Sequence, residues 1–192
     1  MIDLKVPMTE ADARSLKVGD PVSLTGRLVT ARDAAHKYMT EAYRPWLRPI
    51  LEGAVIYHCG PVVQKARGRW VFTAAGPTTS IREEPYQGKV IADYGVRGVI
   101  GKGGMGPQTL AALKSEGAVY LHAIGGAASL LARCVKRVTE VHLLEELGVP
   151  EAFWVIQVER FPVVVTMDSR GRSLHKQVEA VSLANRDAIF GG

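Results

Sequence analysis

The sequence predicts an α/β fold with a mixed sheet, in which crossover helices occupy the middle of the chain. From Gly76 onward, short apolar runs alternate with helical segments, and strands joined by crossover helices run parallel. The beginning and the end of the chain are instead rich in strands. A chain of 192 residues is long enough for one well-packed domain, so we expect residues 1–192 to form a single domain.

The first third of the chain contains three predicted strands and one helix. Apolar and polar residues alternate from Val22 to Leu28, the period of two that is typical of a half-buried strand. Asp33 follows and is suited to the N-cap of a helix. The apolar runs 53–57 and 70–73 are bounded by glycine, proline or charged residues, and they predict two further strands.

The rest of the chain supplies the alternating elements and two late strands. Helices are expected at 82–94, 107–116 and 127–135, with strands at 96–100 and 118–124. Two more strands are expected at 152–158 and 163–167, separated by Phe161-Pro162, and a turn at 168–171 follows them.

The composition favours an anionic substrate or an acidic partner. Lysine and arginine total 24 against 19 acidic residues, which gives a net charge of +5 and an isoelectric point near 9.3. The basic residues are scattered and form no polybasic arm, which argues against nucleic acid. No apolar run reaches membrane-spanning length, and the N-terminus lacks a signal-peptide pattern. With only Cys59 and Cys134, we expect a reduced, cytoplasmic protein that contacts no membrane.

One glycine-rich loop matches a nucleotide-binding pattern. Residues 101–106, GKGGMG, fit GxGxxG between a predicted strand and a predicted helix. No acidic residue ends the next predicted strand, and no Lys-Ser/Thr pair closes the loop, so a dinucleotide or P-loop site is disfavoured. A ligand-free tight turn is one alternative. The other is an anion site, to which the glycines admit the ligand and Lys102 adds positive charge.

Four segments carry residues suited to anions. Arg32 lies between a strand and a helix, Thr78 and Arg82 flank a helix start, Lys102 lies in the glycine-rich loop, and Gly125-Gly126 opens another helix. Arginines bind carboxylates through two parallel hydrogen bonds, and helix N-termini attract negative charge. A small dicarboxylate would need two such contacts, one at each end.

These segments resemble the beta subunit, or C-terminal domain, of class I iron–sulfur fumarases and of the related L(+)-tartrate dehydratases. The resemblance covers about residues 18–171 and keeps the order of the segments. The matching stretches are ARDAAH at 31–36, GP at 60–61, GPTT at 76–79, GKGGMG at 101–106, YLHAIGGAA at 120–128 and FP at 161–162.

The resemblance implies a swivelling β/β/α domain that acts on a small dicarboxylate. The implied reaction is the reversible hydration of fumarate to malate. Dehydration of tartrate, or anion binding without catalysis, is the alternative. By likeness to the family, Arg32 and Arg82 hold the substrate carboxylates, Lys102 adds positive charge, and Thr78 moves the proton at C3. The family also implies a [4Fe–4S] cluster, bound by three cysteines, whose open iron acts as a Lewis acid.

Two cysteines cannot supply three cluster ligands, so the cluster is expected from an alpha subunit. The active site would then lie between the two chains of a hetero-oligomer. Simpler interpretations of single residues stay open: Arg32 could pair with Asp33, Thr79 fits a helix cap, and Lys102 could be solvated. Two histidines are weighed in the same way: His36 is either packed or beside the site, and His122 fits a core histidine with satisfied hydrogen bonds.

Overall fold

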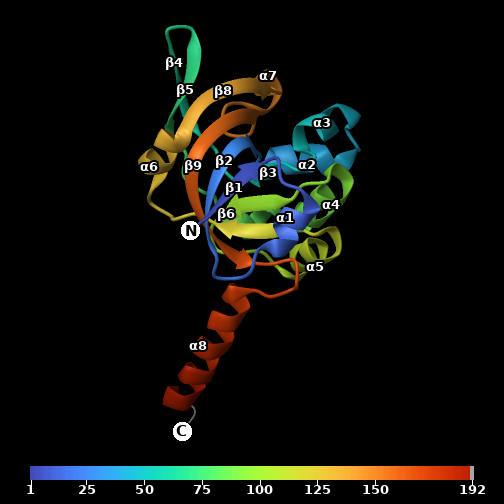
Figure 1. Ribbon diagram of the computed structural model, residues 1–192, viewed down its shortest axis with the longest axis vertical. Coiled ribbons are helices and arrows are strands. Elements are labelled where there is room, and N and C mark those ends of the chain that lie inside the picture. Colours follow the sequence, from blue (N-terminus) through green and yellow to red (C-terminus); the bar gives the residue numbers. More distant parts are fainter. Residues whose placement is uncertain (191–192) are drawn as a thin grey trace.

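The computed structural model describes residues 1–190 and shows a mixed α/β fold (Figure 1). Its strands are β1 (Ile2–Val6), β2 (Pro21–Thr30), β3 (Val55–Tyr57), β4 (Val62–Ala66), β5 (Arg69–Ala74), β6 (Gly98–Gly101), β7 (Val119–His122), β8 (Val135–His142) and β9 (Phe153–Met167). Its α-helices are α1 (Glu10–Ser15), α2 (Asp33–Glu41), α3 (Arg48–Leu51), α4 (Glu84–Tyr94), α5 (Pro107–Glu116), α6 (Ala128–Cys134), α7 (Leu144–Leu147) and α8 (Leu174–Phe190). Two 3₁₀ turns, η1 (Pro45–Leu47) and η2 (Ser80–Glu83), complete the elements of this range.

Five strands close into a mixed barrel. β2, β3, β6 and β7 pair in parallel, and β9 runs antiparallel to both β7 and β2, which joins the two ends of the row. β1 extends the row beside the first half of β2, and β8 pairs with the first half of β9. The α/β class with a mixed sheet and crossover helices is therefore confirmed. The swivelling β/β/α arrangement stays a prediction.

The barrel strands bury both of their faces. Side chains alternate along each strand, so Leu28 and Tyr57 belong to one apolar cluster while Val29 and Ile56 belong to another. The second cluster also contains side chains from α2, α4 and α5, which cover the outside of the ring. The alternation predicted for 22–28 holds in part, since Val22, Leu24 and Leu28 are buried and Thr25 is exposed, but Ser23 is buried as well.

The two strands predicted at 152–158 and 163–167 are one strand, β9. Pro162 cannot donate a hydrogen bond to a neighbouring strand, and it was therefore expected to end the strand. β2 nevertheless accompanies β9 from Val155 to Val164, with an irregularity opposite Gly26. Phe161 is fully buried and packs edge-on against Tyr57, with ring centroids 5.3 Å apart. The pairing with β2 thus continues through Phe161 and Pro162.

Several element boundaries differ from the sequence-based expectation. The helix expected at 82–94 begins as η2 and continues as α4, which ends at Gly95 in the left-handed conformation. The strand at 70–73 pairs with β4 in a separate hairpin. β1, β8 and α8 carried too little periodic pattern to be predicted.

Two parts extend away from the barrel (Figure 1). The β4–β5 hairpin projects at one end of the molecule, and α8 projects at the other. Across residues 1–190, no helix has both the length and the apolar character needed to cross a membrane.

Candidate functional site

The predicted site residues follow the C-terminal ends of the parallel barrel strands. β2 leads to Arg32, β6 leads to Lys102, and β7 leads to the Gly125-Gly126 turn. β3 leads to His58, which the sequence analysis did not single out. In α/β sheets this edge is where ligands bind, because the loops there converge.

Thr78 and Lys102 lie side by side. The Thr78 amide donates a hydrogen bond to the carbonyl of His58 (2.7 Å), and the Lys102 amide donates to the carbonyl of Thr78 (3.1 Å). The Ser80 amide in turn donates to the carbonyl of Lys102 (3.0 Å). The Thr78 turn thus runs along the glycine-rich loop as a short extension of the sheet. Thr78 is half-buried.

Arg32 lies at the start of α2, where it is closely surrounded by Glu151 and Gly60. Its Nε atom is 3.6 Å from Glu151 Oε1, and its side chain is 22% exposed. A Cβ atom at Gly60 would overlap the Arg32 guanidinium, so only glycine leaves the arginine room there. Glu151 also accepts a hydrogen bond from the Ala34 amide (2.9 Å) and so caps α2. The expected N-cap role of Asp33 is wrong, because Asp33 is the first residue of the helix and Arg32 holds the cap position.

Arg82 forms an ion pair with Asp33 and is 55% exposed. Arg82 therefore reaches the start of α2, one residue from Arg32. The alternative in which Arg32 pairs with Asp33 is wrong, since the partner of Arg32 is Glu151. Within the described residues, Lys102 has no carboxylate at ion-pair distance, so its charge is not offset by a neighbour.

The glycine-rich loop leads to a helix start that is already occupied. Glu84 accepts hydrogen bonds from the amides of Gly106 (2.8 Å), Gln108 (2.8 Å) and Thr109 (3.2 Å). A dinucleotide pyrophosphate would need this same N-terminus of α5. The protein's own carboxylate fills it, which supports the interpretation of GKGGMG as something other than a nucleotide site.

Thr79 holds the N-cap position of η2, but its hydroxyl makes no cap hydrogen bond. Its side chain is exposed. The expectation that this hydroxyl caps the helix is therefore wrong. Thr79 instead contributes its backbone, through a bridge to Lys102.

A buried polar cluster lies beneath these turns. His36 and His58 are fully buried, with ring centroids 5.0 Å apart, and Gln87 lies between them. Burial lowers the pKa of both imidazoles, and the neighbouring His36 lowers the pKa of His58 further. His58 Nδ1 lies 2.9 Å from Ser80 Oγ, to which the Tyr120 hydroxyl also donates (2.9 Å). His36 is packed, as one of the two interpretations held, and it also contacts the carbonyl of Arg32 at the predicted site.

Glu83 is a buried carboxyl group beside this cluster. Its side chain is fully buried, neither oxygen has a hydrogen-bond partner within residues 1–190, and Oε2 is 3.9 Å from His58 Nδ1. Burial raises the pKa of Glu83 to about 8, and the neighbouring Asp33 raises it further while Arg82 opposes the change. Glu83 is therefore largely protonated at neutral pH.

Sequence reasoning missed His58, Ser80, Glu83 and Gln87. His58 could have been found, because it directly follows the apolar run 53–57, where a strand end was expected. Gln87 and Glu83 gave no such signal inside a predicted helix. His122 was expected to have its hydrogen bonds satisfied, but its buried Nδ1 atom has no partner among the described residues.

The two cysteines do not fit an iron–sulfur cluster. Cys59 is buried two residues after the end of β3, and burial raises the pKa of its thiol to about 12. Cys134 ends α6 and is only partly buried. A cluster ligand must be a thiolate, and the family's cluster needs three. Throughout residues 1–190, no three His, Cys, Asp or Glu side chains gather closely enough to hold a metal ion.

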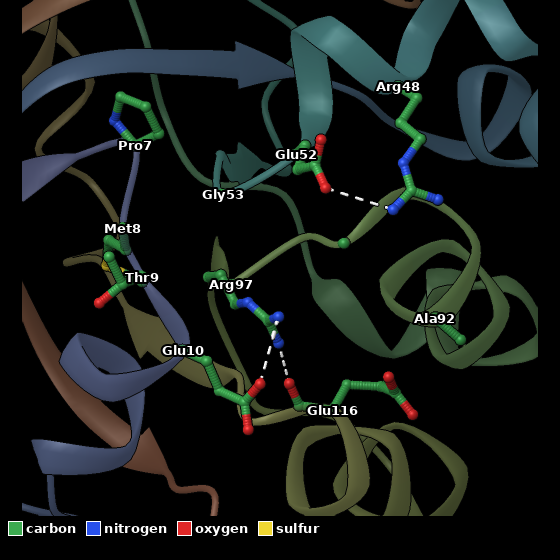
Figure 2. Close-up of a pocket in the computed structure, with 11 residues that line it drawn as sticks. Pro7, Met8, Thr9, Glu10, Arg48, Glu52, Gly53, Ala92, Arg97 and Glu116 are labelled. Carbon is green, nitrogen blue, oxygen red and sulfur yellow. Dashed lines mark hydrogen bonds and ion pairs between the residues drawn. The ribbon is translucent and has the colours of Figure 1, made fainter.

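A separate cavity lies away from these residues (Figure 2). It has a volume of about 460 Å³ and is bordered by Gly53, Arg97 and Glu116, which precede β3, β6 and β7. This is the opposite end of the parallel strands. Its arginines are paired: Arg48 with Glu52, and Arg97 with Glu10 and the carbonyl of Glu116 (Figure 2). The cavity thus offers no free charge to a dicarboxylate.

The chain belongs to the family described as the fumarase C-terminus, whose sequence profile matches residues 1–178. The family contains parts of hydro-lyases of the class I fumarate hydratase and tartrate dehydratase type. The resemblance stated from the sequence is confirmed.

Relatives of both kinds align with nearly the whole chain. A provisionally named class I fumarate hydratase from Geobacillus stearothermophilus is 54% identical over 95% of this chain, which spans 35% of that longer protein. A provisionally named L(+)-tartrate dehydratase subunit beta from Methanocaldococcus jannaschii is 42% identical and matched over 96% of both chains. The L(+)-tartrate dehydratase subunit beta of Escherichia coli strain K12 is 38% identical over 97% of this chain and 92% of its own.

Proposed function

We propose that this chain is the substrate-binding beta subunit of a cytoplasmic hydro-lyase that adds water reversibly to fumarate to form malate. The observation that carries the proposal is the convergence of Arg32, Thr78, Arg82 and Lys102 at one edge of the barrel of a fumarase-family chain. Three cationic side chains at one edge suit a substrate with two carboxylates.

Each of these residues has a proposed part. Arg32 and Arg82 hold the two carboxylates, which requires Arg82 to share or exchange its contact with Asp33. Lys102, which no carboxylate neutralises in residues 1–190, raises the positive potential beside Thr78. In the dehydration direction Thr78 takes the proton from C3, the electron pair of that C–H bond forms the double bond, and the hydroxyl leaves from C2.

A threonine hydroxyl is a weak base, so its deprotonated form needs nearby positive charge. The adjacent Lys102 backbone places the start of that side chain next to the Thr78 turn. The half-buried position of Thr78 limits the water that would compete for the proton.

The family's [4Fe–4S] cluster, which the cysteines of this chain do not fit, would come from an alpha subunit and supply the Lewis acid for the departing hydroxyl. The active site would then lie between two chains, with this chain as the swivelling β/β/α part. A hetero-oligomer follows from that arrangement.

The second candidate substrate is tartrate. The tartrate dehydratase beta subunits match this chain over nearly their whole length, whereas the fumarate hydratase relative is much longer. That relative, however, has the higher identity, 54% against 42% and 38%. We favour fumarate and malate on this difference.

The test is anaerobic co-expression of this chain with a cluster-bearing alpha subunit, followed by assays with malate, fumarate and L(+)-tartrate. Turnover of malate and fumarate by the complex, and none by either chain alone, is the expected result. Preferential turnover of tartrate would show that tartrate, and not fumarate or malate, is the substrate. Brown, cluster-bearing protein from this chain alone would contradict the proposal that the alpha subunit binds the cluster.

A further inference from the structure

Two buried histidines approach the same end of one amide side chain. His36 Nε2 lies 2.9 Å and His58 Nε2 lies 2.8 Å from the atom placed as Gln87 Oε1. The other end of the amide, Nε2, is buried and has no hydrogen-bond partner in the part of the chain that the structure describes. An amide oxygen and an amide NH₂ group have the same shape, so hydrogen-bond partners must decide which of them faces the rings.

The partner of His36 Nδ1 settles that choice. Nδ1 lies 2.9 Å from the backbone carbonyl of Arg32, which can only accept, so the ring must carry its proton on Nδ1. A neutral His36 then has a lone pair on Nε2, and only a donor can satisfy it. The alternative is an imidazolium with both nitrogens protonated, which full burial without a paired carboxylate disfavours.

The same argument determines which ring nitrogen of His58 carries the proton. If an NH₂ group faces both rings, its two hydrogens go one to each Nε2 atom, and His58 carries its proton on Nδ1. That proton points at Ser80 Oγ, 2.9 Å away, which can accept it. Every ring nitrogen is then satisfied without a buried charge.

We infer that Gln87 turns its NH₂ group toward both rings and is a positioning residue that fixes the Arg32 turn relative to the Thr78 turn. The connection runs from the Arg32 carbonyl through His36, Gln87 and His58 to the Thr78 amide, which donates to the His58 carbonyl. This inference rests on the proposed function only in that these two turns would hold the substrate.

Nitrogen-15 NMR of the histidine rings in the full-length chain tests the assignment without any substitution. At about pH 7, His36 and His58 should both be neutral, with the proton on Nδ1 and a bare Nε2. His142, whose ring lies nearer the surface, serves as the reference in the same sample. A protonated Nε2 on either buried ring would overturn the inference.

Gln87→Glu tests the positioning role, because a carboxylate cannot donate to either ring. Both rings should gain a proton on Nε2, and the backbone amide signals around Arg32 and around Thr78 should shift together. Gln177→Glu on the exposed face of α8 is the matched control and should change neither. A change at only one ring or only one turn contradicts the coupling.

In the assembled hydro-lyase, Gln87→Glu should lower kcat/KM about tenfold or more, since a displacement of about 1 Å in a site can cost about 10²-fold. Retention of kcat/KM within about twofold, with Nε2 protonated on both rings, would overturn the positioning role and leave the proposed function intact. Absence of dicarboxylate turnover by the unsubstituted complex would contradict the proposed function, but it would leave the NMR result unaffected.

Discussion

Arg82 and Asp33 form an ion pair that ties η2 to the first residue of α2. The pair bridges two segments that are 49 residues apart in the chain, and it brings the two predicted carboxylate-binding arginines to the same helix start. Because Arg82 is half-exposed, the pair itself contributes little stability. Its importance lies in where it holds the guanidinium.

Removal of either arginine should weaken substrate binding. Arg32→Ala or Arg82→Ala in the assembled enzyme should lose about 1.5–3 kcal/mol in kcat/KM, the value of a hydrogen bond to a charged group. Lysine at either position should restore little, because it cannot form two parallel hydrogen bonds. Arg186→Ala on α8 is the control for loss of an exposed arginine. Retention of kcat/KM within twofold by both alanine variants contradicts the assignment.

Gly60→Ala should act through Arg32. The new Cβ would overlap the guanidinium, so the arginine must move, and kcat/KM should fall. In an Arg32→Ala background the same change should have almost no further effect, as a double-mutant cycle would show. Gly88→Ala in α4 is the control, since its Cβ would meet its neighbours at 3.5 Å or more, an ordinary van der Waals contact. Additive losses would mean that Gly60 serves some other contact.

Thr78 should be needed for proton transfer, and its neighbour should not. Thr78→Ala should lower kcat by about 10²–10⁴ with little change in melting temperature, and Thr78→Ser should keep part of the activity. Thr79→Ala should change neither quantity, because its exposed hydroxyl caps nothing. Deuterium exchange at substrate C3 measures proton removal directly. Normal exchange by Thr78→Ala would exclude Thr78 as the base.

Glu83 should make the protein less stable as the pH rises above neutrality. Its pKa is about 8 in the folded chain and about 4.3 when unfolded, so between these values the folded state holds the extra proton. Stability therefore falls as pH rises through this window, and the loss is complete above about pH 8. The buried His36 and His58 have lowered pKa values, and their opposing effect ends near pH 6.5.

Urea unfolding between about pH 6.5 and 8.5 measures the effect of Glu83 by itself. The unsubstituted chain should lose stability across this range, and Glu83→Gln should flatten the profile. Asp33→Asn should move the loss to lower pH, because Asp33 raises the pKa of Glu83 and its removal brings that pKa closer to the ordinary value. A flat profile for the unsubstituted chain would refute the assignment.

Local patterns in the sequence were enough to predict the alternating elements and the positions of Arg32, Thr78 and Lys102. The closure of the barrel was not predictable, because it depends on β9 pairing with both β2 and β7, far apart in the chain. The helix cap from Glu151 was missed for the same reason, since that residue lies 117 positions from Ala34. Pairings of this kind leave no periodic signal in a single sequence.

The buried cluster beneath the site was also beyond sequence reasoning. Gln87 and Glu83 are common surface residue types in helices, and only the packing of α2 against α4 makes them interior groups. The GKGGMG motif is the converse case, in which the sequence already disfavours a nucleotide site and the tertiary structure gives an independent reason. Glu84, from another helix, takes the amides that the motif seemed to offer.

The place of β9 in the barrel has a consequence for how the protein is made. β9 is the strand that joins β7 to β2, so the ring stays open until residues 153–167 have emerged from the ribosome. Until then β2 lacks its longest partner, and its apolar residues remain accessible to other chains. Nascent chains that stall before β9 should therefore depend on chaperones, whereas chains released after it can close the barrel at once.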